Sequence, residues 1–334
     1  MTLNNKLVVS ASPHDRAHDT ARGIMLDVII ALIPALIASV IYFGPRALIV
    51  ECVSVGSCVI AEYLSRMIMK RHHTIGDFSA VVTGLLLAFN LPVSIELWKV
   101  SLGAIIAIVV VKQFFGGIGQ NFVNPALIGR IVLLASFPTT MSTWTAPLSW
   151  LNGASKLAGT TSASPLAEIH KIALSAGAGP AETLKEMLIG WRAGCLGETC
   201  AIALILGGIY LIVRRVISPA IPAAYIGTVA VIMLIAGKGN FEFVAYELLG
   251  GGLMLGAIFM ATDYTTSPIN FKGKIVFGIG CGILTALIRL FGNLPEGVSY
   301  SIIIMNILVP HIENLTRSKP FGTPKKEKKE AEAK

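Results

Sequence analysis

The sequence predicts an all-α protein that crosses a membrane about ten times, and three observations support this. The 334-residue chain is 54% hydrophobic and only 14% charged, and its mean hydropathy is +0.72. A soluble protein carries about 25% charged residues. Apolar runs that approach the length of a bilayer crossing recur along the chain, and runs of this kind are helical in lipid because a helix satisfies its own backbone hydrogen bonds.

The predicted spans form two groups of five with one long polar stretch between them. In chain order they cover 24–43, 47–65, 77–91, 95–112, 118–137, 196–213, 220–237, 245–262, 275–291 and 298–312. An odd number of spans in each group would turn the second group upside down relative to the first, an arrangement found in transporters. No residue-level similarity between the groups accompanies this count. The predicted divisions are an N-terminal segment 1–22, a first five-helix half 23–137, a loop 138–195, a second half 196–313 and a charged tail 314–334.

The distribution of basic residues predicts the orientation. With ten spans, 18 of the 27 Lys and Arg residues fall on the side of the two termini, seven fall on the other side, and Arg130 and Arg289 lie within spans. Because cytoplasmic loops carry the excess of Lys and Arg, both termini are predicted to be cytoplasmic. The net charge of +8 therefore marks one face of a membrane and does not predict nucleic-acid binding. The first 22 residues contain no apolar segment typical of a signal peptide.

The loop 138–195 is the one long connection, and by this orientation it lies outside the cytoplasm. It is rich in Thr, Ser, Ala and Gly, and loops of this length are usually functional or disordered. Trp144, Trp150 and Trp191 lie where aromatic residues gather at a membrane interface. A short amphipathic helix is expected over 181–189.

Charged side chains at membrane depth are costly and are candidates for function. Arg130 either binds a phosphate or carboxylate through its planar guanidinium or pairs with an acid on a neighbouring helix, and the sequence leaves both open. Glu62 is expected to be an interfacial charge near the cytoplasmic end of its span. Asp263, in Met-Ala-Thr-Asp-Tyr, suits a hard cation, with a helix cap or an interfacial charge as the alternative. Asp27 and Arg289 complete this set.

The most unusual run is Gly-Gly-Ile-Gly-Gln-Asn-Phe-Val-Asn-Pro-Ala at 116–126. Its glycines allow close backbone approach, and Asn121, Asn124 and Pro125 expose polar groups in apolar surroundings. We expect this run to line a cavity or a ligand, with a packing kink as the alternative. Gly250–Gly252 and Gly256 are expected to serve close helix packing.

Several chemistries have no motif in the chain. The five cysteines and six histidines show no CxxC or CxxH spacing, so neither an iron–sulfur nor a zinc site is expected in this chain. The Walker A motif of ATPases and the GxSxG motif of hydrolases are also missing. No dinucleotide-binding fingerprint is visible either.

Four segments together resemble the NqrB/RnfD family, which includes the D subunits of the Rnf complex and NqrB of the sodium-pumping NADH:quinone oxidoreductase. They are Ser-Pro-His at 12–14, the run at 116–126, Thr-Ser-Ala-Ser-Pro-Leu-Ala at 161–167, and Met-Ala-Thr-Asp-Tyr-Thr-Thr-Ser-Pro at 260–268. Asn306 and Pro310 in the last span also fit. The resemblance covers nearly the whole chain and implies a multi-pass subunit of a bacterial or archaeal cell membrane complex.

The resemblance also implies FMN, joined through its phosphate to a side-chain hydroxyl in the outer loop. Ser164 matches the acceptor position of the family motif, with Thr161 and Ser162 just before it. The chain departs from that motif at Ala158, where Asp is usual, at Ser162, where the small residue Gly is usual, and in using Ser rather than Thr as the acceptor. Thr160 and Thr161 are the alternative acceptors.

The implied function is a membrane electron relay within an oxidoreductase that exchanges electrons between ferredoxin and NAD and moves Na⁺ or H⁺. The expected partners are a second covalent-flavin subunit, iron–sulfur subunits and membrane lipid, and a noncovalent flavin is expected by analogy with the riboflavin of NqrB. Arg130, Asn121 and Asn124 are candidate cofactor-binding residues, and Asp263 is the candidate ion-coupling residue. A redox-inactive channel or transporter for a small solute, and a structural scaffold, are the alternatives.

Overall fold

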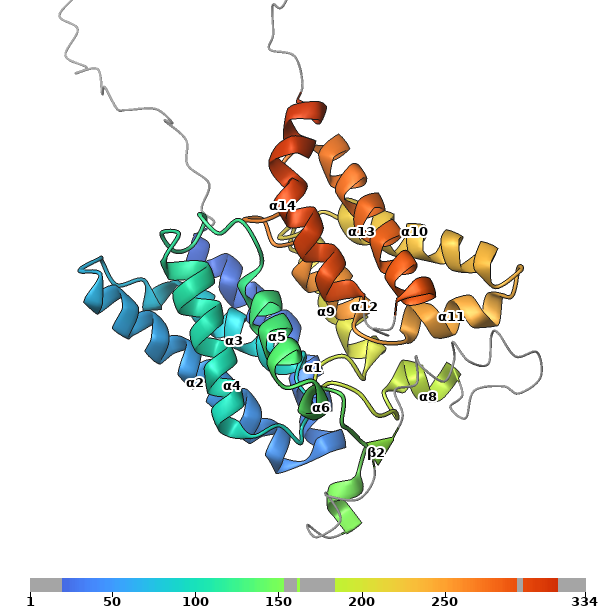
Figure 1. The fold of residues 1–334 in the computed structure, drawn as a ribbon, viewed down its shortest axis with the longest axis horizontal. Coiled ribbons are helices and arrows are strands. Elements are labelled where there is room, and N and C mark those ends of the chain that lie inside the picture. The colour runs from blue at the N-terminus through green and yellow to red at the C-terminus, as the bar shows by residue number, and fades with distance from the viewer. Residues whose placement is uncertain (1–19, 153–160, 163–183, 293–296, 318–334) are drawn as a thin grey trace, which may run out of the picture.

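The computed structural model describes residues 20–152, 161–162, 184–292 and 297–317. Helices make up most of this part of the chain (Figure 1). The described residues contain one pair of strands, β1 (Trp144–Thr145) and β2 (Thr161–Ser162), and each strand is two residues long. The predicted all-α class is therefore confirmed for the residues that the structure describes.

The first helix group contains a helix for each of the first five predicted spans. Thr20 begins α1 by accepting a hydrogen bond from the backbone N–H of Gly23, and Asn124 begins α5 by accepting one from Ala126, with Pro125 at the first helical position. The bounds of the group are α1 (Ala21–Phe43), α2 (Pro45–Ile68), η1 (Ile75–Asp77), α3 (Ser79–Phe89), α4 (Leu97–Ile105), the π-helix η2 (Ile106–Gln113) that continues α4, and α5 (Pro125–Ser136).

Short elements follow α5, and the second helix group then supplies a helix for each of the last five predicted spans. The short elements are α6 (Pro138–Met141), η3 (Ser149–Asn152) and α8 (Leu184–Ile189), the last within the helix expected over 181–189. The second group consists of α9 (Ala201–Val213), α10 (Ala220–Ala236), α11 (Phe241–Leu249), α12 (Leu253–Leu255), the π-helix η5 (Gly256–Met260), α13 (Phe271–Phe291) and α14 (Val298–Thr316).

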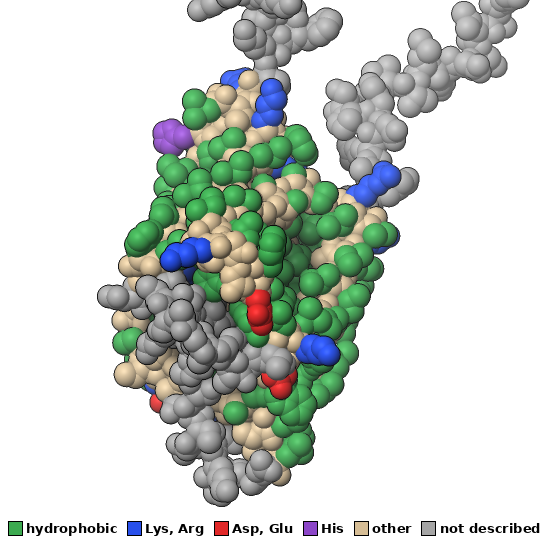
Figure 2. Space-filling model, turned by 90° about the vertical axis from the view of Figure 1, so that its right-hand side faces the viewer, with side chains coloured by type: hydrophobic (Ala, Val, Ile, Leu, Met, Phe, Trp, Pro, Cys, Tyr) green, Lys and Arg blue, Asp and Glu red, His purple; other side chains and the backbone are tan. Residues whose placement is uncertain are grey.

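Among the described residues, length and hydropathy identify four helices that could each cross a membrane alone, namely α1, α2, α13 and α14. The pair formed by α11 and the stretch from α12 to η5 qualifies as a fifth span with a 68° bend, and α3, α5, α9 and α10 are shorter apolar helices. Large apolar side chains such as Ile30, Ile33 and Ile37 of α1 are exposed, and Figure 2 shows a broad hydrophobic surface with few charged side chains. The chain is a multi-pass membrane protein, and the count of ten crossings stays a prediction.

The two helix groups lie side by side, with α1–α5 on one side of Figure 1 and α9–α14 on the other. They meet where α1 packs against α9 and where α5 contacts α14. The start of α1 and the end of α14 lie at one end of the bundle, whereas α6 and β2 lie at the opposite end (Figure 1). We call these the inner end and the outer end, after the predicted orientation. The division of the chain into the five predicted segments, two of them inverted halves, stays a prediction.

The break between α11 and α12 is built from glycine and held by a buried ion pair. Gly251 has a φ of 61°, which favours glycine, and its two neighbours are also glycines. Arg289 of α13 donates to the backbone oxygens of Glu247 (2.6 Å) and Gly250 (3.1 Å) and pairs with the Glu247 carboxylate at 3.1 Å. The expected packing role fits Gly256, where a Cβ would collide with Val298 of α14. Gly250–Gly252 instead mark the bend.

Candidate functional site: a cavity between the helix groups

A cavity of about 80 Å³ lies between the two helix groups, near the inner end. Its walls come from α1, α3, η2 and the 114–124 loop on one side, and from α9, η5 and the 261–265 loop on the other. Most of the wall is apolar, with Met25, Leu86 and Phe259 among its residues. The polar part gathers Ser79, Thr83, Lys112, Asn121, Asn124 and Asp263.

The glycine-rich run shapes one wall of the cavity. Gly116, Gly117 and Gly119 have φ values of 126°, 107° and 86°, a region that side chains rarely allow. These turns bring Asn121 to the cavity with only 8% of its surface exposed, and its Oδ1 atom has no hydrogen-bond partner among the described residues. The prediction that this run lines a cavity is confirmed. A buried amide without a partner is a place where a ligand or water is expected to bind.

Asp263 lies in the opposite wall, in the loop after η5. Its carboxylate accepts hydrogen bonds from the backbone N–H of Thr265 (3.2 Å), the Thr265 hydroxyl (2.8 Å) and the Thr266 hydroxyl (3.4 Å). Burial raises the pKa of Asp263 above its ordinary value, and these hydrogen bonds and the charge of Lys112 lower it by less. The carboxyl is therefore held closer to its neutral form than an exposed aspartate.

Two asparagines hold the Asp263 loop against the first helix group. Asn124 donates from its side-chain nitrogen to the backbone oxygen of Met260 at 3.3 Å. With its amide oriented to match donors and acceptors, Asn306 of α14 donates to the backbone oxygen of Thr266 (3.1 Å) and accepts from the backbone N–H of Asn124 (3.2 Å). The predicted site residues Asn121, Asn124 and Asp263 thus meet at one cavity.

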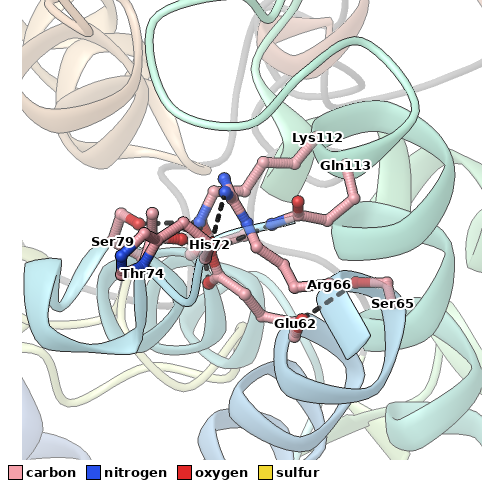
Figure 3. Close-up of polar contacts among 9 residues, drawn as sticks. Glu62, Ser65, Arg66, His72, Thr74, Ser79, Lys112 and Gln113 are labelled. Atoms are coloured by element: carbon pink, nitrogen blue, oxygen red, sulfur yellow. Dashed lines mark hydrogen bonds and ion pairs between the residues drawn. The ribbon is translucent and has the colours of Figure 1, made fainter. Parts of the chain in front are cut away.

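Next to the cavity lies a buried ion pair that sequence reasoning missed. Lys112 of η2 and Glu62 of α2 are 2% and 1% exposed at their side chains and are paired at 3.0 Å. Figure 3 shows that Thr74 and Gln113 also point toward Glu62, and each donates a hydrogen bond to it at 2.9 Å. The expectation that Glu62 is an interfacial charge was wrong, because the 69–74 loop and η2 cover it. Lys112, one of the 18 basic residues counted on the side of the two termini, is buried too.

Arg130 does not line the cavity. Its Nη1 atom donates to Asn90 Oδ1 and to Ser299 Oγ, both at 2.9 Å, and Nη2 contacts Cys195 Sγ at 3.9 Å. These contacts join α5 to the end of α3, to α14 and to the loop before α9. A cofactor-binding role for Arg130 stays a prediction, and the structure places it apart from Asn121, Asn124 and Asp263.

Asp27 is the remaining charged candidate. It accepts a hydrogen bond from the Tyr210 hydroxyl at 2.9 Å and pairs with Arg214 at 3.2 Å, where the Arg214 side chain is 57% exposed. This contact joins α1 to α9 at the surface. A solvent-exposed pair of this kind contributes little to stability.

Only Thr161 and Ser162 of the predicted acceptor region are described, and they lie at the outer end of the bundle (Figure 1). Ser164 and Ala158 are outside the described residues, whereas Thr161 and Ser162 form β2. β2 pairs antiparallel with β1, Thr161 opposite Thr145 and Ser162 opposite Trp144, and β1 follows directly from α5 and α6. The chain just before Ser164 is therefore attached to the helix group that also forms the cavity.

Metal ligands do not gather anywhere in the described part of the chain. No group of three or more His, Cys, Asp or Glu residues there could hold a metal ion. The polar part of the cavity offers hydroxyl, amide, ammonium and carboxylate groups instead.

Comparisons with known proteins connect this geometry to one family. The sequence model of the NQR2, RnfD, RnfE family matches residues 8–322. The chain is 45% identical over 331 residues, 98% of each chain, to the D subunit of the Na(+)-translocating ferredoxin:NAD(+) oxidoreductase complex of Acetobacterium woodii. It is 41% identical over 326 residues, 96% of this chain and 97% of the relative, to the D subunit of the proton-translocating ferredoxin:NAD(+) oxidoreductase complex of Clostridium ljungdahlii. The D subunit of the ion-translocating oxidoreductase complex of Actinobacillus succinogenes is 34% identical over 346 residues, 94% of this chain and 97% of the relative.

Proposed function

The chain belongs to the NQR2, RnfD, RnfE family, and from this premise we propose that it is the D-type membrane subunit of an ion-translocating ferredoxin:NAD⁺ oxidoreductase. The observation that carries the proposal is the match over almost the full length of relatives that bear this name. The resemblance predicted from four short motifs is confirmed. The names of these two relatives differ in the ion, sodium in one and protons in the other, so the ion for this chain stays open.

We propose that Ser164 carries FMN through a phosphoester bond. The bond needs a hydroxyl on a segment held close to the membrane domain. Thr161 and Ser162, just before Ser164 in the chain, form β2, and β2 pairs with β1 at the outer end. The residues present therefore fit the attachment, and the flavin would supply one-electron chemistry at the outer end.

In-gel fluorescence of the denatured subunit tests this attachment. The proposal predicts a fluorescent band at the mass of this chain, lost in Ser164→Ala and retained in Ser164→Thr, which keeps the hydroxyl. Thr161→Val and Thr160→Val serve as matched controls that remove the neighbouring hydroxyls. A band that persists in Ser164→Ala but disappears in one control would move the acceptor to that threonine, and no band in the native complex would refute the flavin.

We propose that a second flavin, a noncovalently bound riboflavin, accepts electrons within the membrane domain. The cavity has apolar walls and a polar part with the Asn121 amide and the Lys112 ammonium, and at about 80 Å³ its walls would have to move apart to admit the ring system. The unpartnered Oδ1 of Asn121 supports binding of a hydrogen-bond donor there. Extraction of the purified complex with acid should release a noncovalent flavin, and Asn121→Leu should lower its amount while the covalent band is unchanged. Equal amounts of released flavin from the unsubstituted complex and from the Asn121→Leu complex would argue against this location.

We propose that the charge of Asp263 couples ion movement to this electron transfer. Electron transfer can drive an ion only if it biases a conformation or charge state that the ion also senses. Asp263→Asn removes the charge and should change ion-dependent turnover while the covalent flavin remains. Ion transport at the unsubstituted rate in that variant would dismiss Asp263.

The proposed setting follows from the same premise. The subunit lies in the bacterial or archaeal cell membrane with both termini in the cytoplasm, beside a second covalent-flavin subunit and iron–sulfur subunits that hold the NAD and ferredoxin sites. A redox-inactive transporter is the alternative, and the cavity between two helix groups would also suit it. The flavin band decides between them, since a transporter has no covalent flavin.

A further inference from the structure

A buried carboxyl lies between α1 and α2, apart from the cavity and from the two buried ion pairs. Glu51 of α2 is 2% exposed, and Ser39 of α1, which it contacts, is fully buried. Glu51 was not among the charged candidates predicted from the sequence. An ionisable side chain buried in a membrane span is a candidate functional site whose partner has to be identified.

The partner of Glu51 is a hydroxyl group and not a cation. Among the described residues, its one hydrogen-bonding contact joins Oε1 to Ser39 Oγ at 2.5 Å, and Oε2 has no partner. By contrast, the buried carboxylates of Glu62 and Glu247 lie 3.0 and 3.1 Å from a lysine and an arginine nitrogen. A buried carboxylate without a cation is strongly unfavourable, so the neutral acid is the stable form of Glu51.

The elements packed against α2 supply no cation to Glu51. These elements are α1, α3, α4, η1 and η2, and α3 carries no titratable group. The titratable groups on the others and on α2 itself are Arg22, Asp27, Tyr42, Arg46, Cys52, Cys58, Glu62, Tyr63, Arg66, Asp77, Lys99 and Lys112. None of these forms an ion pair or hydrogen bond with Glu51. At the outer ends of α2 and α4, Arg46 donates to two backbone oxygens of the 93–95 loop and Lys99 pairs with Glu96.

Counting hydrogens shows which group donates in the contact between Glu51 and Ser39. Ser39 Oγ also lies 2.7 Å from the backbone oxygen of Leu36. A hydroxyl has one hydrogen, and a backbone oxygen can only accept. Both contacts are satisfied together if Ser39 donates to Leu36 and a protonated Glu51 donates to Ser39. An ionised Glu51 would instead receive at most one hydrogen bond for a full negative charge.

The contact lies near the outer end of the first helix group. Glu51 is six residues from Pro45, where α2 begins, which corresponds to about 9 Å along the helix. The turn between α1 and α2 lies beside η3, since Trp150 Nε1 donates to the backbone oxygen of Ile41 at 3.3 Å. A proton therefore has about two helical turns to cross between Glu51 and the outer surface.

We propose that Glu51 is a proton-binding site of the membrane domain, where the carboxyl is held as a neutral acid that donates to Ser39 and exchanges its proton with water at the outer end. In this exchange the O–H bond of Glu51 breaks, the proton passes to water, and a proton from water restores the bond. No electron is transferred. The site is separate from the flavin and does not depend on the proposed function.

Infrared spectroscopy of the assembled complex tests the protonation state directly. At about pH 6 an exposed glutamate, with a pKa of about 4.3, is ionised. The proposal predicts that the difference between the native complex and Glu51→Gln contains the carbonyl band of one protonated carboxyl. Glutamine suits this comparison because it is neutral, similar in size and keeps a donor for Ser39. Glu96→Gln is the matched control, since Glu96 is 58% exposed and paired with Lys99, and it should remove no such band.

Transfer to heavy water tests the exchange. The Glu51 band should move to lower wavenumber while the fold stays intact, because the hydrogen of the carboxyl is replaced by deuterium. A band that stays in place until the complex unfolds would identify a fixed structural hydrogen bond and would overturn the proposal.

Sodium is the competing ligand, because Glu51, Ser39 and the Leu36 carbonyl also offer oxygen atoms to a hard cation. The proposal predicts the same Glu51 band in sodium chloride and in choline chloride at equal concentration. Loss of the band in sodium alone would mean that Na⁺ replaces the proton, which would contradict a proton site.

Ser39→Ala provides a second variant if Glu51→Gln fails to assemble. Without its acceptor the carboxyl should remain protonated, and its band should move to higher wavenumber. No protonated band attributable to Glu51, or an unchanged band in Ser39→Ala, would overturn the proposal. A native complex without flavin would refute the proposed function and leave these spectra unaffected, so the two failures are distinguishable.

Discussion

At the scale of single residues, the arrangement of charge is the informative feature of this protein. Among the described residues, Lys112–Glu62 and Arg289–Glu247 are buried ion pairs, and their contacts differ. Arg289 reaches backbone oxygens at a helix break and so holds a bend, whereas Lys112 reaches only side chains beside a cavity.

Asp263 gives a prediction for stability against pH. Burial raises the pKa of Asp263 in the folded protein above its ordinary value in the unfolded chain. The protonated carboxyl therefore contributes its full stabilisation at pH values below the ordinary pKa, and this contribution is lost as the pH rises through the raised pKa. Asp263→Asn, which is always neutral, should therefore raise the melting temperature at pH 7 and lose this advantage in acid. Thermal unfolding of the purified complex at several pH values measures it. A variant less stable than the native protein at neutral pH would contradict the prediction.

At the scale of elements, two glycine-rich segments shape the path of the chain through the bundle. The 116–119 turn brings the asparagines to the cavity, and the 250–252 segment bends the α11–α12 span. The sequence predicted the first of these, since its glycines were expected to allow close backbone approach, whereas Gly250–Gly252 were expected to serve close packing and mark a bend instead. The sequence could not predict which side chains pack against these glycines, such as the Arg66 guanidinium next to Gly117.

Alanine substitutions in the 116–119 turn distinguish the cost of backbone strain from the cost of a steric clash between the new Cβ atom and a neighbouring side chain. A Cβ at Gly117 would meet the Arg66 side chain at a φ of 107°, whereas one at Gly119 would meet nothing within 4 Å at a φ of 86°. Gly119→Ala should cost about 1–2 kcal/mol from strain alone, and Gly117→Ala should cost more. The shift in thermal unfolding of each variant measures the difference. Equal effects would mean that Arg66 moves aside freely.

At the scale of the whole molecule, the ten predicted spans correspond one by one to helical segments, although most boundaries shift by a few residues. Hydropathy was sufficient for this because each apolar run is separated from the next by polar, glycine or proline residues. It was insufficient for Glu62 and Lys112, which lie at the ends of their spans, where sequence alone does not distinguish a surface charge from one covered by a neighbouring loop. It also missed the contacts of Arg130 with Asn90 and Ser299, which depend on packing between elements distant in sequence.

The orientation of the whole molecule can be tested with cysteine labelling. Lys238, in the turn between α10 and α11, and Lys272, at the start of α13, are both accessible and lie at opposite ends of helices in the second group. With the termini in the cytoplasm, a membrane-impermeant maleimide should label Lys238→Cys in intact cells and Lys272→Cys only after permeabilisation. The unsubstituted chain controls for its native cysteines. The reverse pattern would invert the orientation and place Ser164 inside the cell.

The central claim is that this membrane subunit carries a flavin on Ser164, and the mass of one peptide tests it most directly. Trypsin cuts after Lys156 and Lys171 and so releases residues 157–171 as one piece. From the native complex, this peptide should carry the added mass of FMN less one water, and fragmentation should place it on Ser164. An unmodified peptide from a complex isolated from its own host would contradict the claim.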